Sequence, residues 1–154
     1  MIIADADFLS SFVKIKKIDL ILKAFNVNKV IIPNDVLREL EKAPFFDVVV
    51  ELIESKKIEV KNVNIKAASD ELGIGEEACM TLAKQTGGTL LISDQSAMKH
   101  AGQRGITVLD VPAFLLYCKK KNILSKKDLL EVMRELKEKD YYGFSEEVKQ
   151  WLLQ

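Results

Sequence analysis

The sequence contains few of the residues on which several common active sites depend. Its 154 residues include two cysteines, Cys79 and Cys118, and one histidine, His100. The cysteines form no CxxC pair, so a zinc site of the usual Cys/His type is excluded, as is a His-rich metal site. A Ser-His-Asp triad would have to use His100, but the chain lacks the GxSxG turn that would present the serine. Both cysteines lie in apolar, helix-like segments, so we expect buried free thiols in a reducing cytosol.

Long apolar runs and an excess of one charge are also missing. No segment reaches the roughly 18 apolar residues that a membrane span requires. The N-terminus meets Asp5 without the basic region of a signal peptide. We therefore expect a cytoplasmic protein without membrane contact. Basic and acidic residues number 23 each, so any nucleic-acid partner must be held by a local basic patch or through metal ions.

What the chain does have is an alternation of short apolar segments with helix-like ones. Its length fits one domain, and 48% hydrophobic residues can form a substantial core. Brief apolar runs with little polar alternation predict buried strands. These runs lie at 2–4, 30–32, 58–60, 89–92 and 106–109. The helix-like segments between them predict a parallel sheet covered on both faces.

Proline, glycine and capping residues predict the helix boundaries. Asn34 and Asp35 are expected to cap a helix that Pro44 ends, and Gly73-Ile74-Gly75 is expected to break the chain before a helix at 76–85. The other expected segments are helices at 18–25, 46–53, 96–103 and 111–120, a helical turn at 67–72, and two C-terminal amphipathic helices at 125–138 and 145–153. A polar and aromatic joint at 139–144 connects these last two helices.

Four acids fall near one predicted edge of the sheet. Asp5 ends the first expected strand and Asp94 follows the fourth. In open parallel sheets, ligands bind outside the carboxyl ends of the strands. Glu39 and Glu76 lie early in two of the helices that are expected to begin near the same crevice. Position alone also permits a structural reading, because strand-end aspartates often cap helices and the helix dipole favours glutamates in first turns.

Carboxylates at close range repel one another unless a cation lies among them. Mg²⁺ and Mn²⁺ prefer such hard oxygen ligands. Two ions about 4 Å apart can activate a water and stabilise the attacking and leaving oxygens of a phosphodiester. No side-chain nucleophile is then required, which suits a chain without a triad.

The segments that carry these acids resemble, in order, the four motifs of PIN domains. Ile3-Ala4-Asp5-Ala6-Asp7-Phe8-Leu9 is similar to the first motif and Ile32-Pro33-Asn34-Asp35-Val36-Leu37-Arg38-Glu39-Leu40 to the second. Leu72-Gly73-Ile74-Gly75-Glu76-Glu77-Ala78 resembles the third, and Leu90-Leu91-Ile92-Ser93-Asp94 the fourth. The resemblance covers about residues 1–118, and Gly105-Ile106-Thr107-Val108 matches the last strand of the family.

The resemblance implies a three-layer α/β/α PIN-like fold with a central parallel sheet of about five strands. It implies a nuclease domain at 1–118, with 119–154 as a C-terminal helical extension packed on the same domain. The implied activity is Mg²⁺- or Mn²⁺-dependent endoribonuclease cleavage of RNA, with Asp5, Glu39, Glu76 and Asp94 as the catalytic metal ligands. Many small prokaryotic PIN domains are VapC-like toxins of toxin–antitoxin pairs, so an antitoxin protein and a homodimer are further expected partners.

The sequence departs from the family pattern at two positions and at its end. Asp7 stands where the family usually has Ser, Thr or Asn, which makes it a further metal-ligand candidate or a source of extra negative charge. Glu76 stands where many toxins carry Asp, and Glu77 is the substitute if the register is one residue off. The C-terminal helices extend beyond the minimal domain and could serve dimerisation or a partner.

Other polar residues have both a structural and a functional interpretation. Asp110 and Asp35 are expected to cap helices rather than to bind metal. Ser93 is either a hydrogen-bond partner at the metal site or a packing residue, and His100 is expected to lie at the surface or to pack. Trp151-Leu152-Leu153 predicts a docked apolar tail, within the chain or across a dimer. The candidates for RNA phosphate contact are Lys119, Lys120, Lys121, Lys126, Lys127, Arg38, Lys99 and Arg104.

Two other functions stay open at this point. One is a non-catalytic PIN-like module that binds RNA or a protein, although such a module would have no reason to keep a costly anionic cluster. The other is a different Mg²⁺-dependent phosphoesterase, for which Asp5-Ala6-Asp7 offers a DxD-like strand end. Against it, Asp94-Gln95 supplies only half of the second acidic pair that such an enzyme uses.

Overall fold

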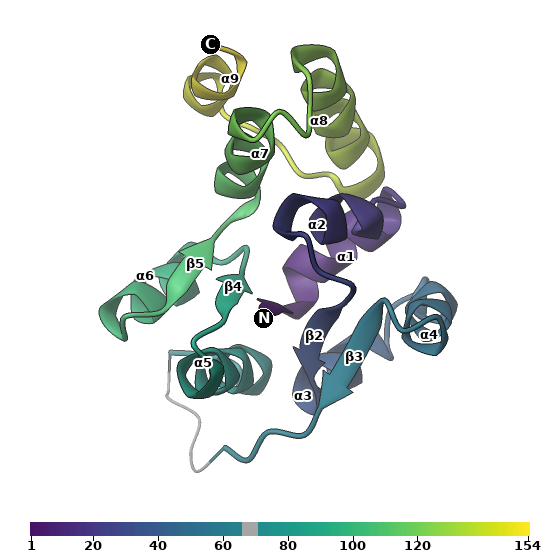
Figure 1. The fold of residues 1–154 in the computed structure, drawn as a ribbon, viewed down its shortest axis with the longest axis vertical. Coiled ribbons are helices and arrows are strands. Elements are labelled where there is room, and N and C mark those ends of the chain that lie inside the picture. The colour runs from purple at the N-terminus through teal and green to yellow at the C-terminus, as the bar shows by residue number, and fades with distance from the viewer. Residues whose placement is uncertain (66–70) are drawn as a thin grey trace.

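The structure is a computed structural model that describes residues 1–65 and 71–154. Its centre is a parallel sheet in the order β3-β2-β1-β4-β5, flanked by helices in three layers (Figure 1). The strands are β1 (Ile2–Ala4), β2 (Val30–Pro33), β3 (Ile58–Lys61), β4 (Thr89–Leu91) and β5 (Thr107–Leu109). The α/β/α fold with five parallel strands, expected from the sequence, is therefore confirmed.

The helices follow the expected alternation. They are α1 (Ala6–Lys14), α2 (Ile18–Phe25), α3 (Asn34–Leu40), α4 (Phe46–Glu54), α5 (Ile74–Thr86), α6 (Gln95–Gln103), α7 (Val111–Lys120), α8 (Lys126–Asp140) and α9 (Glu146–Leu153). The helical turn expected at 67–72 lies outside the described residues except for Glu71 and Leu72, which are not helical.

Two predicted helix boundaries are wrong. Helix α5 begins at Ile74 after an N-cap at Gly73, so Ile74 and Gly75 belong to its first turn and do not form a break. Helix α3 has Pro33 as its N-cap without a side-chain cap. The oxygen of Asn34 instead accepts a hydrogen bond from the backbone N–H of Val63, at 3.1 Å. Pro33 has an extended backbone, and its ring fixes φ near −65°, but it offers no side-chain acceptor to the first turn of α3.

β1 lies in the middle of the sheet and fixes the position of the first acid. All three of its residues are buried, and Ile3 pairs with Ile31 of β2 on one side and with Leu90 of β4 on the other. Gly88 lets β4 approach this strand, since a Cβ at Gly88 would lie only 2.8 Å from the carbonyl oxygen of Met1. The carboxyl ends of β1 and β4 consequently lie side by side.

Aromatic side chains join α1, α2 and α7 into one layer. The rings of Phe8 and Phe12 stack with centroids 5.1 Å apart, and the ring of Phe114 meets both of them edge-on. Phe25 extends the cluster to Tyr117, again with centroids 5.1 Å apart. Such pairs stabilise a core beyond the area that they bury, and here they hold α1, the helix that Asp5 starts.

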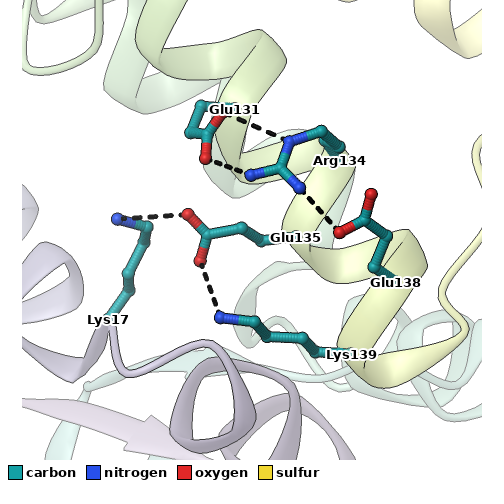
Figure 2. Close-up of polar contacts among 6 residues, drawn as sticks. All are labelled: Lys17, Glu131, Arg134, Glu135, Glu138 and Lys139. Atoms are coloured by element: carbon teal, nitrogen blue, oxygen red, sulfur yellow. Dashed lines mark hydrogen bonds and ion pairs between the residues drawn. The ribbon is translucent and has the colours of Figure 1, made fainter.

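The C-terminal helices pack beside α1 and α7 (Figure 1). Glu135 of α8 lies between Lys17 and Lys139, 3.8 Å from each ammonium group (Figure 2). Arg134 forms ion pairs with two glutamates of its own helix, as Figure 2 shows. The ammonium of Lys119 donates to the carbonyls of Leu152 and Gln154, so this lysine anchors the last helix rather than facing solvent.

The tail and the cysteines pack as the sequence predicts. Leu152 is fully buried, whereas Trp151 is 43% exposed, so the apolar tail docks within the chain through its leucine. Cys79 and Cys118 are both buried free thiols, and burial raises the pKa of the Cys118 thiol to about 12. Within residues 1–65 and 71–154, no helix is long and apolar enough to cross a membrane.

Candidate functional site

Asp5 and Asp94 stand at the carboxyl ends of neighbouring strands, and each caps the helix that follows. Asp5 Oδ1 accepts from the N–H of Phe8 at 2.8 Å, and Asp94 Oδ1 accepts from the N–H of Ala97 at 2.9 Å. Both acids therefore have the structural role of helix caps, but capping uses only one oxygen of each carboxylate. A carboxylate has two oxygens with several acceptor positions, so capping leaves acceptor capacity at the edge of the sheet.

Glu39 approaches this edge from α3 and lies against the backbone of Gly75. A Cβ added to Gly75 would lie 2.4 Å from Glu39 Oε1, a distance that no side chain tolerates. The N–H of Gly75 also donates to the Glu39 carboxylate. A glycine is needed here because any side chain would displace the glutamate from the start of α5. Sequence reasoning treated this glycine only as a break and missed that role.

Glu76 and Glu77 are neighbours in α5 with different surroundings. Glu76 Oε1 accepts from the N–H of Gly73 at 3.1 Å, so it caps the helix while remaining near the other acids. Glu77 is buried and forms a two-pronged ion pair with Arg104, at 2.7 and 3.2 Å. Because Glu77 is committed to Arg104, the geometry favours Glu76 as the member of the acidic cluster. Arg104 is correspondingly less available for RNA than the sequence suggested.

The pKa values of the acids indicate that they form one electrostatic cluster. Burial raises the pKa of Asp5 to about 7, and repulsion from Asp7 and Glu76 adds to the effect, while hydrogen bonds from the backbone of Phe8 and Ser93 oppose it. Asp5 is only 4% exposed. An acid whose pKa lies that far above 3.8 is one that a nearby cation would stabilise in its ionised form.

The same mutual repulsion affects the two glutamates. Burial raises the pKa of Glu39, and the charges of Asp7, Glu76 and Asp35 raise it further. Burial also raises the pKa of Glu76, with Asp94 and Asp7 contributing. Asp7, in the first turn of α1, thus acts on three of the four predicted ligands. Its negative charge adds repulsion to the cluster that an uncharged Ser or Asn at this position would not add.

The arrangement suits a hard divalent cation in its donor types. Carboxylates predominate here, and Mg²⁺ and Mn²⁺ prefer such oxygen ligands. Ser93, directly before Asp94, has a buried Oγ with no hydrogen-bond partner among the described residues. Within that same part of the chain, no three Asp, Glu, His or Cys side chains lie close enough to enclose an ion as they stand. Binding of an ion at this edge would therefore require side chains to move.

Several predicted residues lie elsewhere or have other partners. Asp110 caps α7, as expected, by accepting from the N–H of Ala113 at 2.9 Å. Asp35 does not cap α3; it lies in the first turn and forms an ion pair with Arg38. His100 contacts Glu71 at 2.6 Å on the surface, which agrees with a packing role.

Sequence reasoning missed the part of the site contributed by the C-terminal helices. Asp140, the last residue of α8, accepts hydrogen bonds from Ser11 at 2.5 Å and from Lys14 at 2.8 Å. It thereby joins α8 to the face of α1 that begins at Asp5. No local sequence signal pairs residues this far apart in the chain; only the polar and aromatic character of 139–144 drew attention to this segment.

Comparisons with known proteins agree with this geometry. The whole chain, residues 1–154, matches the DUF3368 family of PIN domains. A similar fold occurs in the solved structure of the PIN domain endonuclease Utp24, which has 16% sequence identity and a TM-score of 0.54 over 71% of this chain and 84% of that one. Curated proteins give no match. The chain therefore belongs to the PIN-domain family.

Proposed function

We propose that this PIN domain is a metal-dependent endoribonuclease that hydrolyses phosphodiester bonds of RNA. The observation that carries the proposal is the electrostatic coupling of four acids: Glu76 raises the pKa values of Asp5 and Glu39, and Asp94 raises the pKa of Glu76. Three of these acids have raised pKa values because burial and their neighbours disfavour ionisation. Folding maintains this unfavourable cluster, which is expected where a cation compensates it.

Each residue has a distinct role in the proposed mechanism. Asp5, Glu39, Glu76 and Asp94 would hold Mg²⁺ or Mn²⁺, with Asp7 as a further ligand or a source of negative charge. A bound ion of this kind supplies Lewis-acid polarisation of the phosphate and lowers the pKa of water. The chain provides the orientation: helix caps fix the rotamers of Asp5 and Asp94, and Gly75 gives the Glu39 carboxylate room.

The decisive experiment compares matched acids within and outside the cluster. Single-stranded RNA is incubated with Mn²⁺ or Mg²⁺ and the wild type, Asp94→Asn or Glu76→Gln, which should each lose at least about tenfold in rate. Asp110→Asn and Glu77→Gln are the controls, because Asp110 caps a helix as Asp94 does and Glu77 adjoins Glu76. Equal rates in the wild type and the two cluster variants would refute the proposal, and so would activity that persists in a chelator.

Membership of the VapC-like toxin branch, with an antitoxin partner and a homodimer, is a finer part of the same proposal. The family resemblance supports it, and the C-terminal helices add exposed apolar residues, Leu130 and Trp151, to the surface. Growth arrest on expression of the wild type, relieved by a small neighbouring reading frame and absent with Asp94→Asn, is the expected result. Light scattering of the pure chain tests the dimer, which a monomer mass would contradict.

A further inference from the structure

The carboxylate cluster continues into a groove that the C-terminal helices help to form. The groove has a volume of about 730 Å³, within the range of roughly 300–1,000 Å³ typical of ligand sites. Its lining includes Asp7 and Ser93, which lie next to acids of the cluster in the sequence, and also Lys14, Phe45, Lys139, Asp140 and Tyr142. The proposed catalytic edge and this groove therefore form one continuous surface.

Each lysine of the groove contacts a carboxylate but keeps donors for a further anion. The ammonium of Lys14 donates to Asp140 at 2.8 Å and lies 5.7 Å from the centre of the Phe45 ring. An ammonium group has three donors, so one ion pair leaves capacity for another anion. Lys139 also lines the groove; its side chain is 51% exposed, and its ammonium lies 3.8 Å from a carboxylate oxygen of Glu135 (Figure 2).

Tyr142, an aromatic residue of the groove, is held in place by contacts of its ring and its backbone. Tyr142 is half-buried and its ring centroid lies 5.1 Å from that of Phe144. Its N–H donates to the carbonyl of Leu136 at 3.0 Å, so the chain turns sharply after α8 and Tyr142 is fixed. The preceding Tyr141 is 90% exposed and lines no part of the groove. Two adjacent tyrosines thus have opposite surroundings, which provides a matched control.

From these observations we propose that the groove binds a single-stranded nucleic acid on its way to the carboxylate cluster, with Lys14 and Lys139 contacting phosphates and Tyr142 stacking on a base. The inference rests on the proposed function for the class of substrate. Single-strand binding combines cationic groups along the backbone with aromatic faces for the bases, and this groove offers both next to the cluster. The proposal gives the C-terminal helices a role in substrate binding.

The lysines of the groove also reduce the repulsion that the acidic edge exerts on a phosphate. Lys14 and Lys139 balance the charges of Asp7 and Asp140 in the lining, so the groove is not acidic as the edge is. Asp5, Glu39, Glu76 and Asp94 repel a phosphodiester backbone, and the chain as a whole has no net charge to attract one. Lysines beside the cluster supply local attraction, while Asp140 occupies one donor of Lys14 and fixes its position. Asp140 is in this sense a positioning residue for Lys14.

The test measures binding and cleavage separately on the full-length chain. Binding of a fluorescein-labelled oligouridine of about 12 nucleotides is followed by anisotropy with Mn²⁺ in the Asp94→Asn background, where cleavage is suppressed. Tyr142→Leu keeps apolar volume and removes the stacking plane, and should weaken binding roughly 5- to 150-fold. Tyr142→Phe should restore it. Tyr141→Leu, the matched control, should leave binding unchanged.

The lysines are tested through salt dependence. Lys139→Gln should lower the slope of log affinity against log salt by about 0.7, the value for one lost phosphate contact on a single strand. Lys137→Gln, on the same helix but outside the groove, should not alter the slope. A merely structural role for Lys139 would weaken binding without this change in slope.

The outcomes separate the groove from the proposed catalysis. If the wild type cleaves RNA, but Tyr142→Leu and Lys139→Gln bind it as their control variants do, the proposed role of the groove is wrong and the proposed nuclease activity stands. Binding that depends on Tyr142, in a wild type that does not cleave, overturns the nuclease and supports the groove. Absence of both binding and cleavage overturns both, and preference for a duplex of the same sequence over the single strand also overturns the groove.

Discussion

Replacement of Asp5 by Asn should stabilise the metal-free protein at neutral pH while abolishing its response to metal. The Asp5 carboxyl has a pKa of about 7 in the folded chain, against an ordinary value of 3.8. Between pH 3.8 and 7, Asp5 is ionised in the unfolded chain but still protonated in the folded chain. The contribution of Asp5 to the free energy of unfolding is therefore fully present below about pH 4 and is lost as the pH rises to about 7.

The size of this effect follows from the pKa difference. At about 1.4 kcal/mol for each pH unit, ionisation of Asp5 removes about 4 kcal/mol of stability by pH 8. Asn cannot ionise, and its oxygen can still accept the 2.8 Å cap from Phe8. The variant loses the second backbone hydrogen bond, from Ser93, which costs it about 1–2 kcal/mol of stability. We expect a net gain of about 2–3 kcal/mol at pH 8, or roughly 4–12 °C in Tm for a chain of this length.

Thermal and urea unfolding of wild type and Asp5→Asn in a chelator, at pH 5 and pH 8, measures this difference. The advantage of the variant should be larger at pH 8 by about 3 kcal/mol. Addition of Mn²⁺ at about 100 times its Kd should stabilise the wild type by about 2.7 kcal/mol and the variant far less. Asp110→Asn, which alters a different helix cap, is the control and should show neither change. A pH-independent difference, or an equal Mn²⁺ effect in both proteins, would refute this explanation of the cluster.

Two further predictions concern the start of α5. Gly75→Ala should fold normally, because alanine is the better helix former by up to about 1 kcal/mol, but its Cβ would displace Glu39 and lower metal-dependent cleavage at least about tenfold. Gly102→Ala, where a Cβ has free space, should keep full activity, and equal activity of both variants would contradict the packing argument. Glu77→Gln should destabilise the chain by about 1–3 kcal/mol in urea, since it breaks a partly buried ion pair with Arg104, yet leave the folded enzyme active. A loss of activity without a loss of stability would instead place Glu77 in the catalytic cluster.

The fold could be predicted from the sequence because its signals are local. The strands are short apolar runs, such as Val30–Pro33, and the segments between them have helical spacing. Parallel pairing then follows, since each strand is separated from the next by a helix. The end of α3 before Pro44 could likewise be predicted from one residue.

The site was only partly predictable, because its remaining features depend on tertiary contacts. The positions of Asp5 and Asp94 follow from the ends of their strands. The choice of Glu76 over Glu77 depends on Arg104, which is distant in sequence and turns Glu77 away. The role of Gly75 depends on the approach of α3, and the groove depends on the contact between Asp140 and α1. Such contacts leave no periodicity in a single sequence from which they could be inferred.

The central pairing of β1 with β4 has a consequence for the order in which this protein is made. Ile3 pairs with Leu90, so more than half of the chain must leave the ribosome before the first strand can pair with β4, although β2 on its other side is made much earlier. Contacts between residues so distant in sequence form slowly, because closing the intervening loop is entropically unfavourable. Asp5 and Asp94 become neighbours only at that step. A nascent or partly folded chain would therefore carry the acids without assembling them, and nuclease activity would appear late, after the sheet is complete.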